Sequence, residues 1–242
     1  MKDLLAIAGV LLAAAGPLLA QGRAGDLRGL PVHEYAPAGD VRGGFVFLSG
    51  DGGWRSFDKT NADSLQAGGW FVLGVDAMTL FSHEVSSDSL AALVRLFVDA
   101  VRSRVPAGTP VYVGGYSFGA ELAADALPHG VGADGLYLLG PGVRGIRKIT
   151  LGGFLFREPR GPTSFDVAER LNGERCTPIA FVTGSDDHEG KGAAVFPQVR
   201  QPAEQFLVPG AGHHYNGGDI GYTNVMREAL AWLAAHRTRC GR

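Results

Sequence analysis

The sequence has few cysteines, little net charge and no regular repeat. Its 242 residues carry 22 basic and 24 acidic side chains, so the formal net charge is −2, and nothing in this balance indicates a nucleic-acid partner. Glycine is abundant, at 37 residues, but it follows no Gly-X-Y period, which excludes a collagen-like chain. Hydrophobic residues make up 45% of the chain, which is enough for a packed core and excludes wholesale disorder.

Cysteine and histidine show none of the spacings of a metal site. The two cysteines, Cys176 and Cys240, lie too far apart in the chain for a zinc motif. Five histidines are scattered without paired spacing: His33, His83, His129, His188 and His236. We therefore predict no metal and no cofactor. In an oxidising compartment the two cysteines would form one bridge that ties the C-terminal tail to the body of the protein; two unpaired thiols are the alternative.

The longest apolar run lies at the N-terminus, from Leu4 to Ala20, and is shorter than the roughly 20 residues that span a membrane. Gly16 and Pro17 lie near its end, and it closes on small residues before a polar stretch. These features predict a secretory signal peptide over residues 1–20, cut near residues 20–24, and hence an exported protein. An uncleaved membrane anchor is the alternative interpretation.

Beyond the leader, short apolar runs alternate with helical patterns. We expect strands near 45–50, 70–76, 111–115, 135–140, 178–184 and 204–210, and helices near 56–67, 86–105, 117–127 and 222–236. This alternation predicts an α/β fold, a mostly parallel central sheet with helices on both faces, as a single domain over residues 30–242. Such sheets bind ligands at the carboxyl ends of their strands, so the residues that follow the strands are the candidate site.

The segment Gly115–Gly119 matches G-x-S-x-G between an apolar run and a helical pattern. In α/β-hydrolases this motif is a tight strand-to-helix turn that exposes the serine, here Ser117. A serine hydroxyl needs a histidine base that is oriented by an acid, and in this fold the acid and then the histidine follow later strands. Asp187 after 178–184 and His213 after 204–210 fit that order, so we predict a Ser117–Asp187–His213 triad.

The acid and the histidine each have an adjacent residue of the same type that could take their place in the triad. Asp186 is the alternative acid, and His214 is the alternative histidine. For the oxyanion hole we expect the backbone N–H of Phe118 together with that of Asp51 or Gly52, in the glycine-rich loop after the strand at 45–50. That loop lacks the lysine and the serine or threonine of a phosphate-binding P-loop.

At these residues the chain resembles the bacterial virulence proteins VirJ and AcvB. The resemblance rests on LSGDGGW (48–54), GVD (74–76), GGYSFGAE (114–121), LLGPG (138–142), VTGSDD (182–187) and PGAGHHYNGG (209–218), and it spans nearly the whole mature chain. It implies a periplasmic α/β-hydrolase that cleaves aminoacyl-phosphatidylglycerol, chiefly the lysyl form, with a link to virulence and type IV secretion. The alternatives are a general periplasmic carboxylesterase or thioesterase, and a non-catalytic adaptor that binds secretion-system proteins.

A lysyl headgroup carries two positive charges, so we expect carboxylates in the pocket. Glu121 lies one turn beyond Ser117 on a helix that is packed inside this fold, and Asp51 and Asp76 follow strands at the same end. For Glu121, the alternative is an ion pair with a nearby arginine.

Residues 142–160 form an insertion point where hydrolases of this fold commonly carry lids. Basic residues flank an apolar run from Ile149 to Phe156, and one interpretation is an extra strand with solvated charges at its ends. The other is peripheral contact with an anionic membrane, in which the apolar side chains Leu151, Phe154 and Phe156 enter the interface. The basic residues are Arg144, Arg147, Lys148, Arg157 and Arg160.

Overall fold

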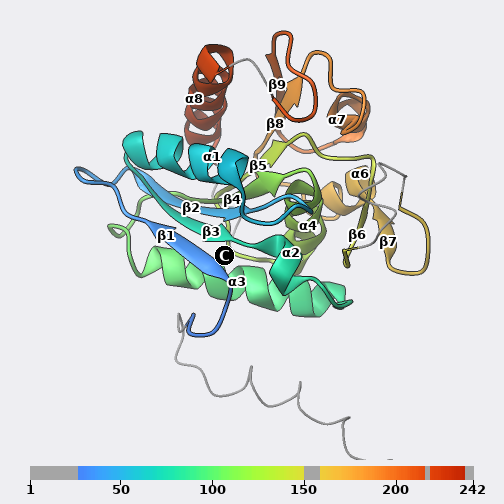
Figure 1. Ribbon diagram of the computed structural model, residues 1–242, viewed down its shortest axis with the longest axis horizontal. Helices are drawn as coiled ribbons and strands as arrows, with labels where there is room; N and C mark the ends of the chain where they lie inside the picture. Colours follow the sequence, from blue (N-terminus) through green and yellow to red (C-terminus); the bar gives the residue numbers. More distant parts are fainter. Residues whose placement is uncertain (1–26, 150–158, 216–218, 238–242) are drawn as a thin grey trace, which may run out of the picture.

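The computed structural model describes residues 27–149, 159–215 and 219–237, which form one α/β domain (Figure 1). Its central sheet has the strand order β1-β3-β2-β4-β5-β8-β9. All neighbouring pairs are parallel except β1 and β3, so β1 is an antiparallel edge strand. The strands are β1 (Val32–Tyr35), β2 (Gly43–Leu48), β3 (Trp70–Val75), β4 (Val111–Tyr116), β5 (Gly135–Leu139), β8 (Ile179–Gly184) and β9 (Ala203–Val208).

Each inner strand buries both of its faces, which is why the strands read as continuous apolar runs rather than as alternating ones. In β2, Val46 and Leu48 pack on one side of the sheet, and Phe45 and Phe47 pack on the other. Figure 1 shows the two helical layers that cover these faces: α3 (Ser87–Arg102) and α4 (Phe118–Ala126) on one side, and α1 (Ser56–Ala67) and α8 (Asp219–Ala235) on the other.

The helices begin where the sequence provides a cap. The Ser86 side chain accepts a hydrogen bond from the Ser89 N–H at the start of α3, whose buried face carries the apolar residues of the amphipathic pattern. The short helices α2 (Ala77–Leu80) and α7 (Gly192–Val195) and the 3-10 turns η1 (Leu127–His129) and η2 (Phe196–Gln198) were not predicted. They are too short to produce a helical period in the sequence.

The chain between β5 and β8 leaves the central sheet. It forms a small antiparallel pair, β6 (Arg144–Ile146) with β7 (Ser164–Asp166), followed by α6 (Val167–Leu171). Residues 150–158, which hold most of the predicted extra strand, lie outside the described residues, as do the predicted signal peptide and Cys240. Cys176 is disulfide-bonded. Among the described residues, no helix has the length and hydrophobicity needed to cross a membrane.

Candidate active site

Ser117 occupies the sharpest turn of the sheet's carboxyl edge. Strand β4 ends at Tyr116 and helix α4 begins at Phe118, so Ser117 alone makes the turn, with a positive φ of 51°. Its N–H donates to the Leu139 carbonyl at 2.8 Å. A side chain at Gly115 or Gly119 would strike the carbonyl oxygen of Leu48. The two glycines of the motif are therefore required by close backbone packing, and the strained turn exposes the serine hydroxyl.

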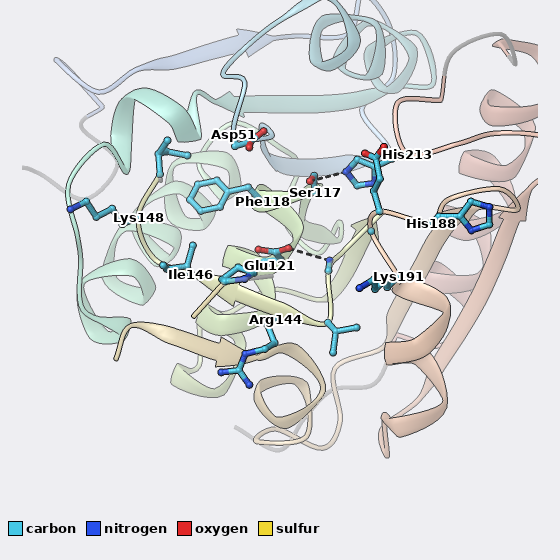
Figure 2. Close-up of a pocket in the computed structure, with 16 residues that line it drawn as sticks. Asp51, Ser117, Phe118, Glu121, Arg144, Ile146, Lys148, His188, Lys191 and His213 are labelled. Atoms are coloured by element: carbon cyan, nitrogen blue, oxygen red, sulfur yellow. Dashed lines mark hydrogen bonds between the residues drawn. The ribbon is translucent and has the colours of Figure 1, made fainter. Parts of the chain in front are cut away.

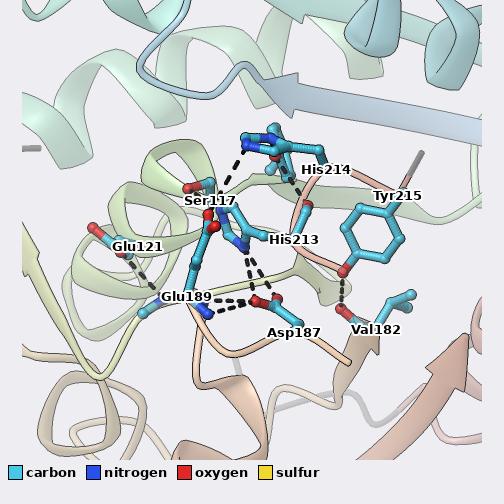
Figure 3. Close-up of polar contacts among 11 residues, drawn as sticks. Ser117, Glu121, Val182, Asp187, Glu189, His213, His214 and Tyr215 are labelled. Atoms are coloured by element: carbon cyan, nitrogen blue, oxygen red, sulfur yellow. Dashed lines mark hydrogen bonds and ion pairs between the residues drawn. The ribbon is translucent and has the colours of Figure 1, made fainter. Parts of the chain in front are cut away.

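Loops after β4, β8 and β9 bring three polar side chains together (Figure 3). His213 Nε2 lies 2.9 Å from Ser117 Oγ, and His213 Nδ1 lies 3.2 and 3.1 Å from Asp187 Oδ1 and Oδ2. An ionised carboxylate can only accept, so Nδ1 carries the ring proton. Nε2 is then the acceptor for the serine hydroxyl, which is the arrangement that a general base requires.

The Asp187 side chain is fully buried and held by the loop that follows it. The N–H groups of Glu189 and Gly190 donate to its Oδ1 at 3.0 and 2.8 Å. Burial alone would raise the pKa of Asp187, but the hydrogen bonds from His213 and from these two amides hold it below its usual range. Asp186 is exposed, and its Oδ1 instead accepts from Ser185 Oγ at 3.0 Å.

Gly190 belongs to this arrangement, and the sequence analysis missed it. A Cβ there would lie 2.6 Å from Asp187 Oδ2 and 2.9 Å from His213 Nδ1, so any larger residue would push the acid and the histidine apart. The signal in the sequence was only a glycine three positions after the acid, and 37 glycines make such a signal too common to find.

His214 takes a different position from His213. The His213 side chain is almost buried, whereas that of His214 is 56% exposed and lies 3.2 Å from the Tyr116 hydroxyl through its Nδ1. The Tyr116 hydroxyl donates to the His213 carbonyl at 3.0 Å. His214 therefore belongs to the contacts that hold this loop, and it does not contact Ser117.

Hydrogen bonds hold the loop from Ser49 to Arg55 at both of its ends. Ser49 Oγ accepts from the Ala77 N–H at 3.0 Å, and the Arg55 Nε donates to the Gly52 carbonyl at 2.6 Å. Asp51 lines the same pocket as Ser117 and Phe118, whereas Gly52 is not among the lining residues. The Phe118 N–H is the first of helix α4 and has no acceptor within the helix. Of the predicted sources of oxyanion donors, Phe118 and Asp51 thus line the pocket together with Ser117.

Ser117 and His213 open into a pocket of about 260 Å³ (Figure 2). One wall is apolar and consists of Phe118, Val143, Ile146, Ile149 and Pro159. The other residues that line the pocket are mostly polar or charged and include Asp51, Glu121, Glu189, Lys148 and Lys191. The pocket can therefore hold a small molecule that has both charged and apolar parts.

Glu121 lies in the wall of this pocket. Its N–H donates to the Ser117 carbonyl at 3.1 Å, and its Oε1 accepts from the Gly142 N–H at 3.2 Å. Burial raises the pKa of Glu121 to about 8. The alternative of an arginine partner is wrong for the described residues, because the nearby Arg144 donates to Ser164 Oγ. The acid therefore lines the pocket without a cationic partner in the described part of the chain.

Asp76 was predicted to bind substrate, and the structure contradicts this. Its carboxylate caps helix α2, accepting from the Thr79 N–H at 3.1 Å and from the Thr79 hydroxyl at 2.9 Å. It is not among the residues that line the pocket. The sequence placed Asp76 correctly after a strand, but a short helix there uses its carboxylate as an N-cap.

With the site described, the chain can be compared with known proteins. A family model described as bacterial virulence protein (VirJ) matches residues 44–234. The chain belongs to this family. The match confirms the resemblance that the sequence motifs indicated. Among curated proteins, no sequence matches the chain.

Solved structures share the fold of this VirJ-family chain. Est1E from Butyrivibrio proteoclasticus matches with a TM-score of 0.63 at 15% identity, over 87% of this chain and 97% of that one. The esterase domain of a Rhodothermus marinus protein matches with a TM-score of 0.61 at 14% identity, over 85% and 92%. A dienelactone hydrolase from Anabaena variabilis gives a TM-score of 0.57 at 16% identity, over 86% and 92%. The predicted α/β-hydrolase fold is confirmed.

The basic residues of the VirJ-family insertion do not form one surface. Arg147 contacts Asp125 of α4, whose side chain is fully buried, with a distance of 3.3 Å between Nη1 and Oδ2. The Arg147 side chain is only 13% exposed and is held by this ion pair, so it is not a free surface charge. Arg144 and Lys148 line the pocket. Arg157 and the apolar residues Leu151, Phe154 and Phe156 lie outside the described residues.

Proposed function

We propose that this chain is an exported serine hydrolase that cleaves the carboxylic ester of aminoacyl-phosphatidylglycerol, with the lysyl form as its main substrate. The observation that carries the proposal is the hydrogen-bonded series Asp187–His213–Ser117 at the end of a pocket. Asp187 is the acid, His213 the base and Ser117 the nucleophile.

In the first half of the reaction, His213 Nε2 takes the proton of the Ser117 hydroxyl as Oγ attacks the ester carbonyl carbon. The negative charge that develops on the carbonyl oxygen is held by the Phe118 N–H and by that of Asp51 or Gly52. The C–O bond to the glycerol then breaks, and the His213 imidazolium protonates the departing oxygen. This step leaves the amino acid as an ester on Ser117 and releases phosphatidylglycerol.

In the second half, water replaces the glycerol. His213 takes a proton from the water as its oxygen attacks the acyl carbon, and the imidazolium then protonates Ser117 Oγ as the bond to the amino acid breaks. The buried Asp187, whose pKa is held low by its hydrogen bonds, stabilises the imidazolium in both halves. The products are the free amino acid and the regenerated serine.

The dimensions and lining of the pocket support this class of substrate. A volume of about 260 Å³ accommodates an aminoacyl headgroup, whereas two acyl chains would have to remain outside. Carboxylates of Asp51 and Glu121 line the interior, which suits an amine, and Lys148 and Lys191 provide positive charges for a phosphodiester.

The decisive experiment uses vesicles of phosphatidylglycerol that contain lysyl-phosphatidylglycerol. The purified mature protein is added, and released lysine and remaining lipid are measured by mass spectrometry. We expect the wild type to release lysine and Ser117→Ala to release none above the buffer rate. Hydrolysis of simple short-chain esters without action on the lipid would replace this proposal with a general carboxylesterase. Inactivity on both classes of ester would favour a non-catalytic adaptor of a secretion system.

The proposal includes export to the periplasm. The predicted signal peptide and the family support this location, and cell fractionation with the full chain tests it. We expect the mature protein in the periplasmic fraction with its leader removed; a cytoplasmic protein that keeps residues 1–20 would contradict the location.

A further inference from the structure

Glu121 is an acid without a counter-charge among the residues that the structure describes. Burial raises its pKa to about 8, the Gly142 N–H opposes this effect, and the neighbouring Asp51 carboxylate adds to it. Among the described residues, no lysine, arginine or histidine pairs with its carboxyl. A buried carboxyl with one amide donor is poorly compensated when it is ionised. An ionised Glu121 carboxylate would therefore be stabilised by a positively charged group that enters the pocket.

The position of Glu121 restricts where that charge can come from. Glu121 lies in the first turn of α4, four residues after Ser117, and its N–H donates to the Ser117 carbonyl at 3.1 Å. Both side chains line the same pocket, and Figure 2 shows the Glu121 carboxyl beside Ser117 and Phe118. The reacting carbonyl carbon must come within about 3–3.5 Å of Ser117 Oγ. The Glu121 carboxyl and the reacting carbon therefore share one pocket, and they belong to adjoining turns of the chain.

An aminoacyl ester has two kinds of amine at different distances from its carbonyl carbon. The α-amine is attached to the adjacent carbon, whereas the ε-amine of a lysyl group lies four methylene groups farther along the side chain. When the ester carbonyl lies at Ser117, the α-ammonium is the amine placed next to the first turn of α4. There it can donate a hydrogen bond to the Glu121 carboxyl. The ε-ammonium would lie farther out in the pocket.

Asp51 supports the same location. It lines the pocket, and its carboxylate is close enough to raise the pKa of Glu121. Burial also raises the pKa of Asp51. A carboxylate that raises the pKa of a second carboxyl in the same pocket favours a cation between the two.

We propose that Glu121, assisted by Asp51, binds the α-ammonium group of the aminoacyl ester and so selects esters of amino acids with a free α-amine, whatever their side chain. This inference rests on the proposed function. It makes Glu121 a substrate-binding residue for the α-amine, rather than for the second charge that distinguishes a lysyl headgroup from other aminoacyl headgroups.

The first test needs no variant of the protein. Glycerol esters of lysine are prepared with the acetyl group on either the α- or the ε-nitrogen, so that the two esters have the same composition and one free amine each, and they are compared at about pH 6, where both amines are protonated. We expect kcat/KM to be at least about tenfold higher for the ester with the free α-amine, as expected for a hydrogen bond to a charged group. Equal rates, or faster hydrolysis of the α-acetyl ester, would overturn the proposal.

The second test uses Glu121→Gln, which keeps the size of the side chain and removes its charge. We expect KM for the ε-acetyl ester to rise about tenfold with kcat little changed, since the lost contact is the same in the ground and transition states. The α-acetyl ester should be unaffected. Glu189→Gln removes another carboxylate from the same pocket, and we expect it to change both esters alike. The same uniform change in Glu121→Gln would overturn the proposal.

These outcomes can be distinguished from a failure of the proposed function. If the wild type hydrolyses neither of the acetylated esters nor a neutral short-chain ester, then the serine hydrolase itself is wrong. If it hydrolyses the neutral ester and both lysine esters equally, then the hydrolase stands and the role of Glu121 is wrong.

Discussion

Two regions form the pocket, and different kinds of contact hold them in place. At the carboxyl edge of the sheet, Ser117, Asp187 and His213 are positioned by the ends of parallel strands and by backbone amides. The segment from Gly142 to Ile149, which contributes much of the apolar lining, is held by the β6–β7 pair and by backbone hydrogen bonds to Phe81, Val85 and Val167, and in addition by buried ion pairs to helix α4. There Asp125 of α4 accepts contacts from Arg147 and Arg170, at 3.3 and 2.9 Å. Changes at the edge should therefore affect chemistry, and changes under the wall should affect stability.

The largest expected effect comes from removing the base. His213→Ala should lower kcat for ester hydrolysis by a factor of about 10⁴ or more, as much as the loss of the nucleophile, because the two groups act as a unit. The free energy of unfolding should change far less than catalysis does. Steady-state kinetics with a short-chain ester, together with urea unfolding, measure both quantities. Unchanged turnover in His213→Ala would contradict the assigned base.

The two adjacent acids provide the next comparison. Asp187→Asn should lower kcat by about 10⁴, because an amide cannot hold the histidine in the required tautomer. Asp186→Asn is the matched control, since its exposed carboxylate contacts only Ser185 among the described residues, and its kcat should stay within about twofold of the wild type. If kcat falls further in Asp186→Asn than in Asp187→Asn, then Asp186 is the acid of the triad and Asp187 is not.

Under the wall of the pocket, Asp125→Ala should lower the free energy of unfolding by about 3–5 kcal/mol, because it leaves buried positive charge without a partner. Asp88→Ala is the control. Its carboxylate lies 3.1 Å from His129 but its side chain is 90% exposed, so the cost should be below about 1 kcal/mol. Chemical denaturation compares the two variants. Similar losses in the free energy of unfolding for the two variants would mean that Asp125 and its arginine partners do not hold the segment from Gly142 to Ile149.

The last of these effects concerns pH, and it is the smallest per step because it is spread over several pH units. The pKa of Glu121 is raised from 4.5 to about 8 in the folded protein, so between these values the folded state holds a proton that the unfolded state releases. Rising pH should therefore lower the free energy of unfolding from about pH 5 to pH 8, by at most about 1.4 kcal/mol per pH unit, and this contribution should level off above pH 8. Glu121→Gln should lack it. Parallel slopes for the two proteins would contradict the raised pKa.

The same contrast explains what could be predicted from the sequence. The strands, the turn at Ser117 and the positions of Asp187 and His213 depend on local patterns: apolar runs, glycines that permit a close backbone approach, and polar residues directly after strands. The contacts of Asp125, Arg147 and Glu121 join segments far apart in the chain, and the sequence alone gave no reason to pair them. Arg147 looked like a surface charge, and Asp76 looked like a pocket residue until the helix that it caps was known.

The roles of backbone groups in the site could not be predicted from the sequence either. Gly190 matters through its N–H and through the absence of a side chain beside His213, and nothing in one sequence separates it from glycines that face open space, such as Gly39. For the same reason, the choice between Asp186 and Asp187 depended on the geometry of a loop rather than on residue type.

The central claim is that Ser117 is a nucleophile activated by His213 and Asp187. Its most direct test is covalent labelling of the mature protein with a fluorophosphonate, followed by intact-mass measurement and peptide mapping. We predict one adduct per chain, located on Ser117, formed rapidly by the wild type and far more slowly by His213→Ala and Asp187→Asn. No adduct on the wild type, or an adduct on another residue that persists in Ser117→Ala, would contradict the account.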